Sequence, residues 1–147
     1  MNEPTLPLQK HLFAGLIFDE QGQPVEAVYV GREPCYVVND RGFRRHIPAI
    51  EVDRQVFEAI VKQIQGHEDF ISEQAAKMLG QDDPFSKAMI ATQLRNISQQ
   101  FPLLLITGIP EETRAYLGMT GFKIIINVHG EVIQIAQPGM INPDEEQ

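Results

Sequence analysis

The sequence predicts an α+β fold, and three observations support this prediction. Residues 12–47 contain short β-prone runs separated by turns rich in Gly, Pro, Asn and Asp, which is typical of antiparallel hairpins. Residues 50–80 place apolar side chains at helical spacing and keep them within one half of the helical wheel. Residues 122–136 are again β-prone on both sides of a His-Gly turn. We therefore expect a sheet, then helices, then a closing hairpin.

The N-terminal part is predicted to be an antiparallel meander of about four strands. The expected strands cover residues 12–18, 25–30, 35–38 and 43–47, and polar turns join them. Polar and apolar residues alternate in the second strand, so one face of the sheet is expected to be solvated and the other covered. Residues 1–10 carry two prolines and little pattern, and we expect them to form an extended arm.

The longest predicted element is an amphipathic helix over residues 50–80. Pro48 suits its first turn, where the missing N–H costs little. Glu51 and Asp53 place negative charge near the N-terminus of the helix, where the macrodipole favours it. Gly80 follows Lys77 in the last turn and is a suitable stop.

The length of this helix raises a question about its path. A continuous helix over these residues would be about 45 Å long, whereas a compact chain of this size has a diameter of about 40 Å. The helix therefore either breaks or bends at Gly66, which gives separate helices over residues 50–65 and 67–79, or projects and buries its apolar half against a second chain. The unbroken apolar phase favours a continuous or gently bent helix. His67 falls within the apolar half of the wheel, so we expect it to be packed.

The rest of the chain predicts a second helix, a short helix and the C-terminal hairpin. Asp82 or Asp83 can cap the second helix, Pro84 suits its first position, and its apolar stripe runs to Phe101. Residues 103–106 fit either a short buried strand or an irregular helical turn. Residues 110–117 fit a short helix. The hairpin at 122–136 is too apolar to stand alone, so we expect it to pack on or extend the N-terminal sheet.

The composition excludes several classes of protein. The 147 residues fit one domain, 1–147, in which we expect residues 138–147 to form a flexible acidic tail. Twenty acidic against twelve basic residues give a net charge of −8, which argues against a nucleic-acid binder and against a polybasic membrane anchor. A single cysteine excludes an intramolecular disulfide. With no signal peptide and no long apolar run, we expect a cytoplasmic protein without a membrane segment.

The most distinctive polar cluster consists of Arg41, Arg44, Arg45 and His46, with Arg54 shortly after it. In an acidic protein, a local excess of guanidinium groups is suited to a carboxylate, a phosphate or a partner protein. The alternative is an ordinary solvated strand edge, whose charges are neutralised by neighbouring carboxylates and prevent aggregation. These carboxylates would be Asp40, Glu51 and Asp53.

No motif in the sequence predicts catalysis, a metal site or a cofactor. The four histidines form no pair at metal-ligand spacing, and Cys35 has no identifiable base nearby. No P-loop, dinucleotide fingerprint or nucleophile elbow is present. We therefore assign no catalytic residue, no metal ligand and no cofactor, and the sequence favours a protein that is not an enzyme.

Two functions are consistent with these observations. The first is a non-enzymatic protein-interaction module, either a homodimer or an accessory subunit of a cytoplasmic assembly, because the apolar half of the long helix exceeds what one small sheet can cover. The second is a domain that binds a small molecule or an anion, with or without enzymatic activity. It would have a pocket between sheet and helices and Arg44, Arg45 and His46 at its mouth.

Overall fold

The computed structural model describes residues 8–137, and these residues form two compact units. The first unit comprises the described parts of residues 1–56 and 104–147, and the second comprises Phe57–Leu103. Most of the expected N-terminal arm and the whole expected C-terminal tail lie outside the described residues. Strands and helices occur together in the predicted order, so the α+β class is confirmed. The assignment of residues 1–147 to one domain stays a prediction, because compactness alone does not show whether the units fold independently.

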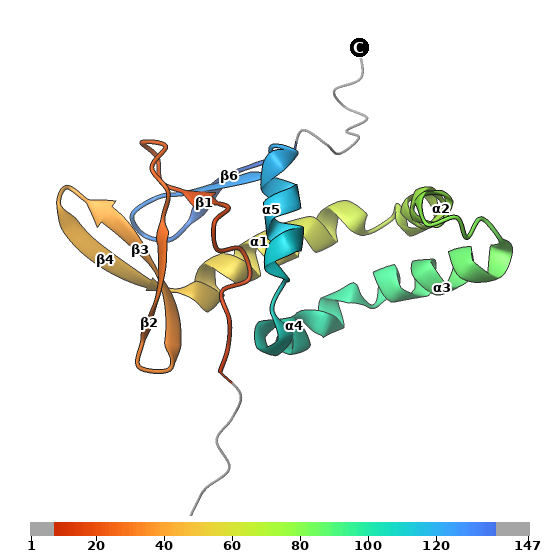
Figure 1. Ribbon diagram of the computed structural model, residues 1–147, viewed down its shortest axis with the longest axis horizontal. Helices are drawn as coiled ribbons and strands as arrows, with labels where there is room; N and C mark the ends of the chain where they lie inside the picture. Colours follow the sequence, from red (N-terminus) through yellow and green to blue (C-terminus); the bar gives the residue numbers. More distant parts are fainter. Residues whose placement is uncertain (1–7, 138–147) are drawn as a thin grey trace, which may run out of the picture. The chain divides into compact units, whose positions relative to one another are not determined.

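The first unit contains two three-stranded sheets (Figure 1). One is the antiparallel meander of β2 (Glu26–Val30), β3 (Glu33–Asp40) and β4 (Phe43–Pro48), drawn in orange. The other has the order β1-β5-β6, in which β1 (Ile17–Phe18) runs parallel to β5 (Lys123–Ile126), and β6 (Val132–Ala136) runs antiparallel to β5. The meander therefore has three strands, and the C-terminal hairpin pairs with β1 rather than with the meander.

The strand predicted over residues 12–18 is largely absent. Only Ile17 and Phe18 form a strand, and their partners are Ile124 and Ile125. The apolar residues before them are buried without joining a ladder, and Gly15 interrupts the extended chain with φ +87°. The β-like pattern of these residues reflects burial in the core, which periodicity alone does not distinguish from pairing in a sheet.

The hairpin of β5 and β6 is fastened to the first part of α1 (Ala49–Ile64) by one glutamine. Gln55 donates from Nε2 to the carbonyl of Gly130 at 2.8 Å and accepts from the amide of Val132 at 2.9 Å. Gly130 adopts φ +84°, and a Cβ placed on it would lie 2.7 Å from Cγ2 of Ile47. The hairpin therefore approaches β4 so closely that only glycine fits at this position.

The long helix is interrupted at Gly66, which confirms the alternative of two separate helices, so the favoured continuous or gently bent helix is wrong. α1 ends at Ile64, and α2 (Glu68–Met78) begins after Gly66, which adopts φ +87°. A residue in this left-handed conformation cannot continue an α-helix, although its neighbours keep the apolar phase. His67 lies at the N-terminus of α2 and is exposed, contrary to the packing expected for it.

The remaining helices are α3 (Pro84–Arg95), α4 (Phe101–Thr107) and α5 (Glu111–Met119), with the 3₁₀ turn Ile97–Gln100 before α4. Asp83 caps α3 as expected, because its Oδ1 accepts from the amide of Ser86 at 2.8 Å. Residues 103–106 are helical, which decides between the two predicted alternatives. α2 and α3 pack against each other within the second unit (Figure 1). Within residues 8–137, no helix is both long and apolar enough to cross a membrane.

Candidate functional site

The structure separates the five residues predicted to form a binding patch. Arg44 and His46 extend from one face of β4, whereas Arg45 extends from the opposite face, because successive strand residues alternate. Arg41 lies in the turn between β3 and β4 with φ +56°, and Arg54 lies on α1. The four arginines therefore do not converge on one point, and their role in binding stays a prediction.

Two of these arginines already have carboxylate partners. Arg44 pairs with Glu26 of β2 at 2.9 Å, and Arg45 pairs with Asp40 at 2.8 Å. The pairing of Arg45 with Asp40 agrees with the alternative of a neutralised strand edge. Asp53, which that alternative also offered as a surface partner, is instead fully buried.

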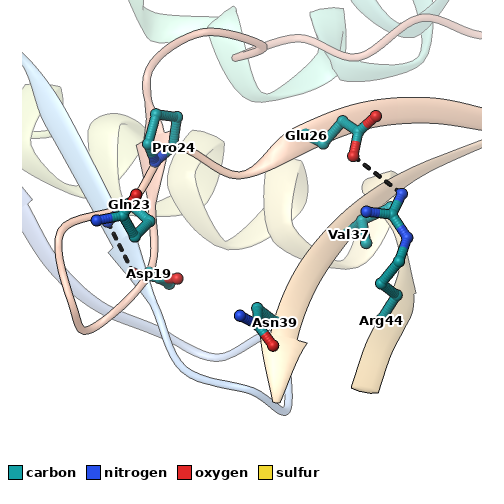
Figure 2. Close-up of a pocket in the computed structure, with 7 residues that line it drawn as sticks. All are labelled: Asp19, Gln23, Pro24, Glu26, Val37, Asn39 and Arg44. Carbon is teal, nitrogen blue, oxygen red and sulfur yellow. Dashed lines mark hydrogen bonds and ion pairs between the residues drawn. The ribbon is translucent and has the colours of Figure 1, made fainter. Parts of the chain in front are cut away.

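A small pocket of about 190 Å³ lies on the face of the meander that carries Arg44 (Figure 2). The loop between β1 and β2 forms one wall, and the three strands of the meander form the other. It is thus a pocket between a loop and a sheet, in contrast to the expected pocket between sheet and helices. Its lining residues are Asp19, Gln23, Pro24, Glu26, Val37, Asn39 and Arg44.

The lining of this pocket is polar and carries more negative than positive charge. Asp19 is 5% exposed, and its Oδ1 accepts from the amides of Gln21 and Gln23, both at 2.9 Å, which fixes the loop wall. Glu26 and Arg44 neutralise each other across the rim. Because Asp19 is then the uncompensated charge, the pocket suits a small cationic or neutral polar group better than an anion.

The irregular segment Leu8–Leu16, which we call the strap, is held by hydrogen bonds to several elements of the first unit. The hydroxyl of Tyr29 on β2 donates to the carbonyl of Gln9 at 3.0 Å, and the amide of Lys10 donates to the carbonyl of Leu105 on α4 at 2.8 Å. Arg114 on α5 donates to the carbonyl of Ala14 at 2.8 Å. His11 places Nε2 within 2.8 and 3.1 Å of the carbonyls of Val28 and Cys35, respectively.

The centre of the strap contacts a buried carboxylate and a buried phenol. Asp53 on α1 accepts from the amide of Leu12 at 2.9 Å and from the hydroxyl of Tyr36 at 2.7 Å. The Tyr36 oxygen in turn accepts from the amide of Phe13 at 3.3 Å. The side chains of both Asp53 and Tyr36 are 0% exposed. We call Asp53, Tyr36 and the two strap amides the buried cluster.

Burial changes the acidity of both side chains in this cluster. Loss of solvation raises the pKa of Asp53 to about 7, although the hydrogen bonds from Leu12 and Tyr36 oppose part of that rise. Burial, followed by the nearby Asp53 charge, raises the pKa of Tyr36 well above its ordinary value. Asp53 is therefore a proton-binding group near neutral pH, but it lies inside the core, where no substrate reaches it.

Sequence reasoning missed the buried cluster because Asp53 was interpreted as a surface charge near a helix N-terminus. A signal for its burial is nevertheless present. Val56, Phe57 and Ile60 follow Asp53 at spacings of three, four and seven residues, which places its carboxylate on the apolar face of the helix. A charged residue on that face requires buried partners, and Tyr36 provides one of them.

Large apolar side chains are exposed in both units, but those of the second unit are concentrated in one stretch of the chain. Five of them lie within residues 70–89, on α2, α3 and the turn between these helices. They are Phe70 (49% exposed), Met78 (85%), Leu79 (65%), Phe85 (74%) and Met89 (49%). We call these five side chains the apolar surface of the helical unit.

The comparisons with known proteins give no family for this chain. No family model, no curated protein and no solved structure matches it. Among residues 8–137, no group of three or more His, Cys, Asp or Glu side chains is arranged to hold a metal ion. Any functional inference therefore depends on the geometry of the chain itself.

Proposed function

We propose that this protein is a non-enzymatic, cytoplasmic interaction module that forms a homodimer through the apolar surface of its helical unit. The observation that carries this proposal is the exposure of five large apolar side chains within residues 70–89. Contiguous apolar patches on monomeric proteins are typically about 300–600 Å² and often mark interaction sites.

The extent of this surface agrees with the requirement of a dimer. Side chains of the size of Phe present roughly 150–250 Å² each, so five of them at 49% to 85% exposure present on the order of 600 Å². A standard interface buries about 800 Å² on each partner. Buried together at one interface, these five side chains would supply most of its area, and neighbouring polar residues would supply the rest.

The charge of the helical hairpin also permits two copies to meet. The chain carries a net charge of −8, but residues 68–95 contain three basic residues against five acidic ones. Three ion pairs lie within this hairpin and its ends, namely Lys77–Glu73, Lys87–Asp82 and Arg95–Asp69. Like-charge repulsion between two hairpins is thus smaller than the charge of the whole chain implies.

A dilution series followed by sedimentation velocity tests the dimer. The full chain is expected to have twice the mass of one chain at high concentration and to dissociate on dilution. The double variant Phe70→Ser/Phe85→Ser removes two aromatic anchors and is expected to raise the dimer Kd at least about tenfold.

The matched control is Tyr116→Ser, which removes a 64% exposed aromatic side chain from α5 in the first unit. This variant is expected to leave the Kd unchanged. A wild-type chain that is monomeric at every concentration contradicts the proposal. A Kd raised by Tyr116→Ser but unaffected by the double variant contradicts the assignment of the surface.

The pocket beside Arg44 supports a second candidate function, the binding of a small polar ligand. A thermal-shift screen of small amines, polyols, carboxylates and phosphates tests it, and stabilisation by the amines or polyols is expected. Arg44→Ala is expected to change this stabilisation because Arg44 lines the pocket, whereas Arg45→Ala is the control on the opposite face of β4. A screen in which no compound raises the Tm of the wild type contradicts this second candidate.

A further inference from the structure

The strap is a segment without regular structure whose buried centre depends on one ionisable group. Leu12 and Phe13 are 0% and 3% exposed, and neither of their amides donates to a backbone carbonyl in a helix or a ladder. The amide of Leu12 donates to Asp53 Oδ2 at 2.9 Å, and the amide of Phe13 donates to the Tyr36 oxygen at 3.3 Å. The Tyr36 hydroxyl then donates to Asp53 Oδ1 at 2.7 Å. Both strap amides are therefore satisfied directly or indirectly through Asp53.

We propose that the buried cluster is a proton-controlled latch, in which proton uptake by Asp53 favours the fastening of the strap Leu8–Leu16 to β3 and α1. The geometry that carries this proposal is a fully buried carboxyl group with hydrogen bonds from the strap and from β3, but with no ion pair to a basic side chain among the described residues. An ionised carboxylate in such a site loses its hydration and gains no countercharge in direct contact. In the proposed latch, release of the strap removes the Leu12 amide from Oδ2 of Asp53 and admits water to the carboxylate.

The charged and titratable groups around Asp53 do not replace the missing countercharge. Arg114 on α5 directs its guanidinium to the carbonyls of Ala14 and Ile109. Its charge acts on Tyr36, whose pKa it lowers as a minor effect. The strap carries Lys10 and also His11, which is bonded to two carbonyls. Strand β3 carries Cys35 and Tyr36. Helix α1 carries Glu51 and Arg54, and both are exposed. Because histidine side chains as a class change charge near neutral pH, His11 needs its own control.

The direction of the pH dependence follows from the two states of Asp53. With the strap fastened, the pKa of Asp53 is raised to about 7 by burial. With the strap released, the carboxyl is solvated and its pKa is about 4. The fastened state therefore binds one more proton between these two values. The equilibrium constant for fastening is largest at low pH. It falls by up to tenfold per pH unit as the pH rises towards 7, and it becomes constant above 7.

Amide hydrogen exchange measured by NMR on the full chain tests the latch. The released state is a minor population, since Leu12 and Phe13 leave the core, and exchange detects such minor states. The protection factors of these two amides, normalised to the intrinsic rate at each pH, are expected to fall roughly 50- to 100-fold between pH 5 and pH 7.5. The amides between β3 and β4 are expected to be protected more strongly, because local release leaves the meander intact.

Three variants identify the group that binds the proton. Asp53→Asn keeps an acceptor for the Leu12 amide but cannot ionise, so it is expected to abolish the pH dependence. Tyr36→Phe removes a hydrogen bond that lowers the pKa of Asp53, so the dependence is expected to persist and move to higher pH. His11→Gln is expected to leave the dependence in place. Asp19→Asn is the matched control, since Asp19 is a second buried carboxylate, 5% exposed, in the same unit.

Several results would overturn the latch. Protection of Leu12 and Phe13 that is constant with pH excludes it, as does a pH dependence abolished by His11→Gln. Protection equal to that of the β3–β4 amides shows that the strap opens only on global unfolding. If Asp53→Asn does not fold, the carboxyl ¹³C resonance of Asp53 in the wild type decides: a midpoint near 7 supports the latch, and a midpoint near 4 refutes it.

Discussion

The two units of this chain bury their side chains in different ways. The largest fully buried side chains, among them Tyr36, Leu12 and Ile124, all belong to the first unit. The second unit buries mainly small residues along α2 and α3, such as Ala76 and Ala91, while Phe70 and Phe85 are exposed. The first unit also exposes large apolar side chains, such as Phe43, Tyr116 and Met119, but they are scattered along its sequence, whereas five of those in the second unit lie within residues 70–89. We therefore expect the large buried side chains of the first unit to contribute most to stability, and the exposed side chains of residues 70–89 to contact the partner.

The largest contrast is expected between two aromatic residues, one from each unit. Tyr36→Ala leaves a cavity and removes the donor to Asp53, so the free energy of unfolding is expected to fall by about 3–5 kcal/mol. Phe85→Ala is expected to change it by no more than about 0.5 kcal/mol in dilute solution, because the side chain is 74% exposed. Urea denaturation of both variants at low concentration measures the difference. Equal effects would contradict the division of roles between the units.

A smaller contrast is expected between two glycines of the first unit with the same backbone conformation. Gly130 and Gly22 adopt φ +84° and +83°, but only at Gly130 would a Cβ meet another residue, Ile47. Gly22→Ala is expected to cost about 1–2 kcal/mol through its backbone conformation alone. Gly130→Ala is expected to cost about 1–3 kcal/mol more, because the hairpin must move away from β4. Thermal or urea unfolding of the two variants isolates the contribution of this close approach.

The smallest effect is expected at the cap of α3 in the helical unit. Hydrogen bonds from the amide and hydroxyl of Ser86 lower the pKa of Asp83. The contribution of the ionised cap is therefore present above the ordinary pKa of an aspartate and is lost as the pH falls through the lowered value. Asp83→Ala is expected to decrease the helix signal in circular dichroism slightly, and Asp83→Asn is expected to retain most of it. A large loss of stability in Asp83→Ala would show that the helical unit depends on this cap more than its packing indicates.

Local signals predicted most of the fold. The Asp83-Pro84 pair predicted the start of α3, and the turn at His129 and Gly130 predicted the C-terminal hairpin, because caps and tight turns depend on residues close in sequence. The sequence allowed a break or bend at Gly66, but the apolar phase across this residue favoured a continuous or gently bent helix. Its φ of +87° shows that the phase of side chains can be preserved where the backbone is interrupted.

The parts that could not be predicted depend on contacts between residues far apart in sequence. Leu12 and Phe13 have the composition of a strand, yet their amides are satisfied by the side chains of Tyr36 and Asp53. No pattern within the first twenty residues specifies those partners. The pocket also depends on residues far apart in sequence, since the loop at Asp19 and Arg44 meet only in the folded first unit. The arginine patch was overestimated because a strand alternates its side chains between two faces.

The pairing of β1 with β5 has a consequence for how the chain is made. Ile17 and Ile124 are neighbours in the sheet, and Ala14 is bonded to Arg114, a hundred positions later in the sequence. During synthesis the N-terminal strap emerges from the ribosome long before either partner exists. Residues 57–103 of the helical unit are continuous in sequence, so all of them emerge before β5. The pairing of β1 with β5 and the bond from Arg114 to Ala14 therefore form late, whereas Tyr36 and Asp53, the partners of Phe13 and Leu12, emerge early.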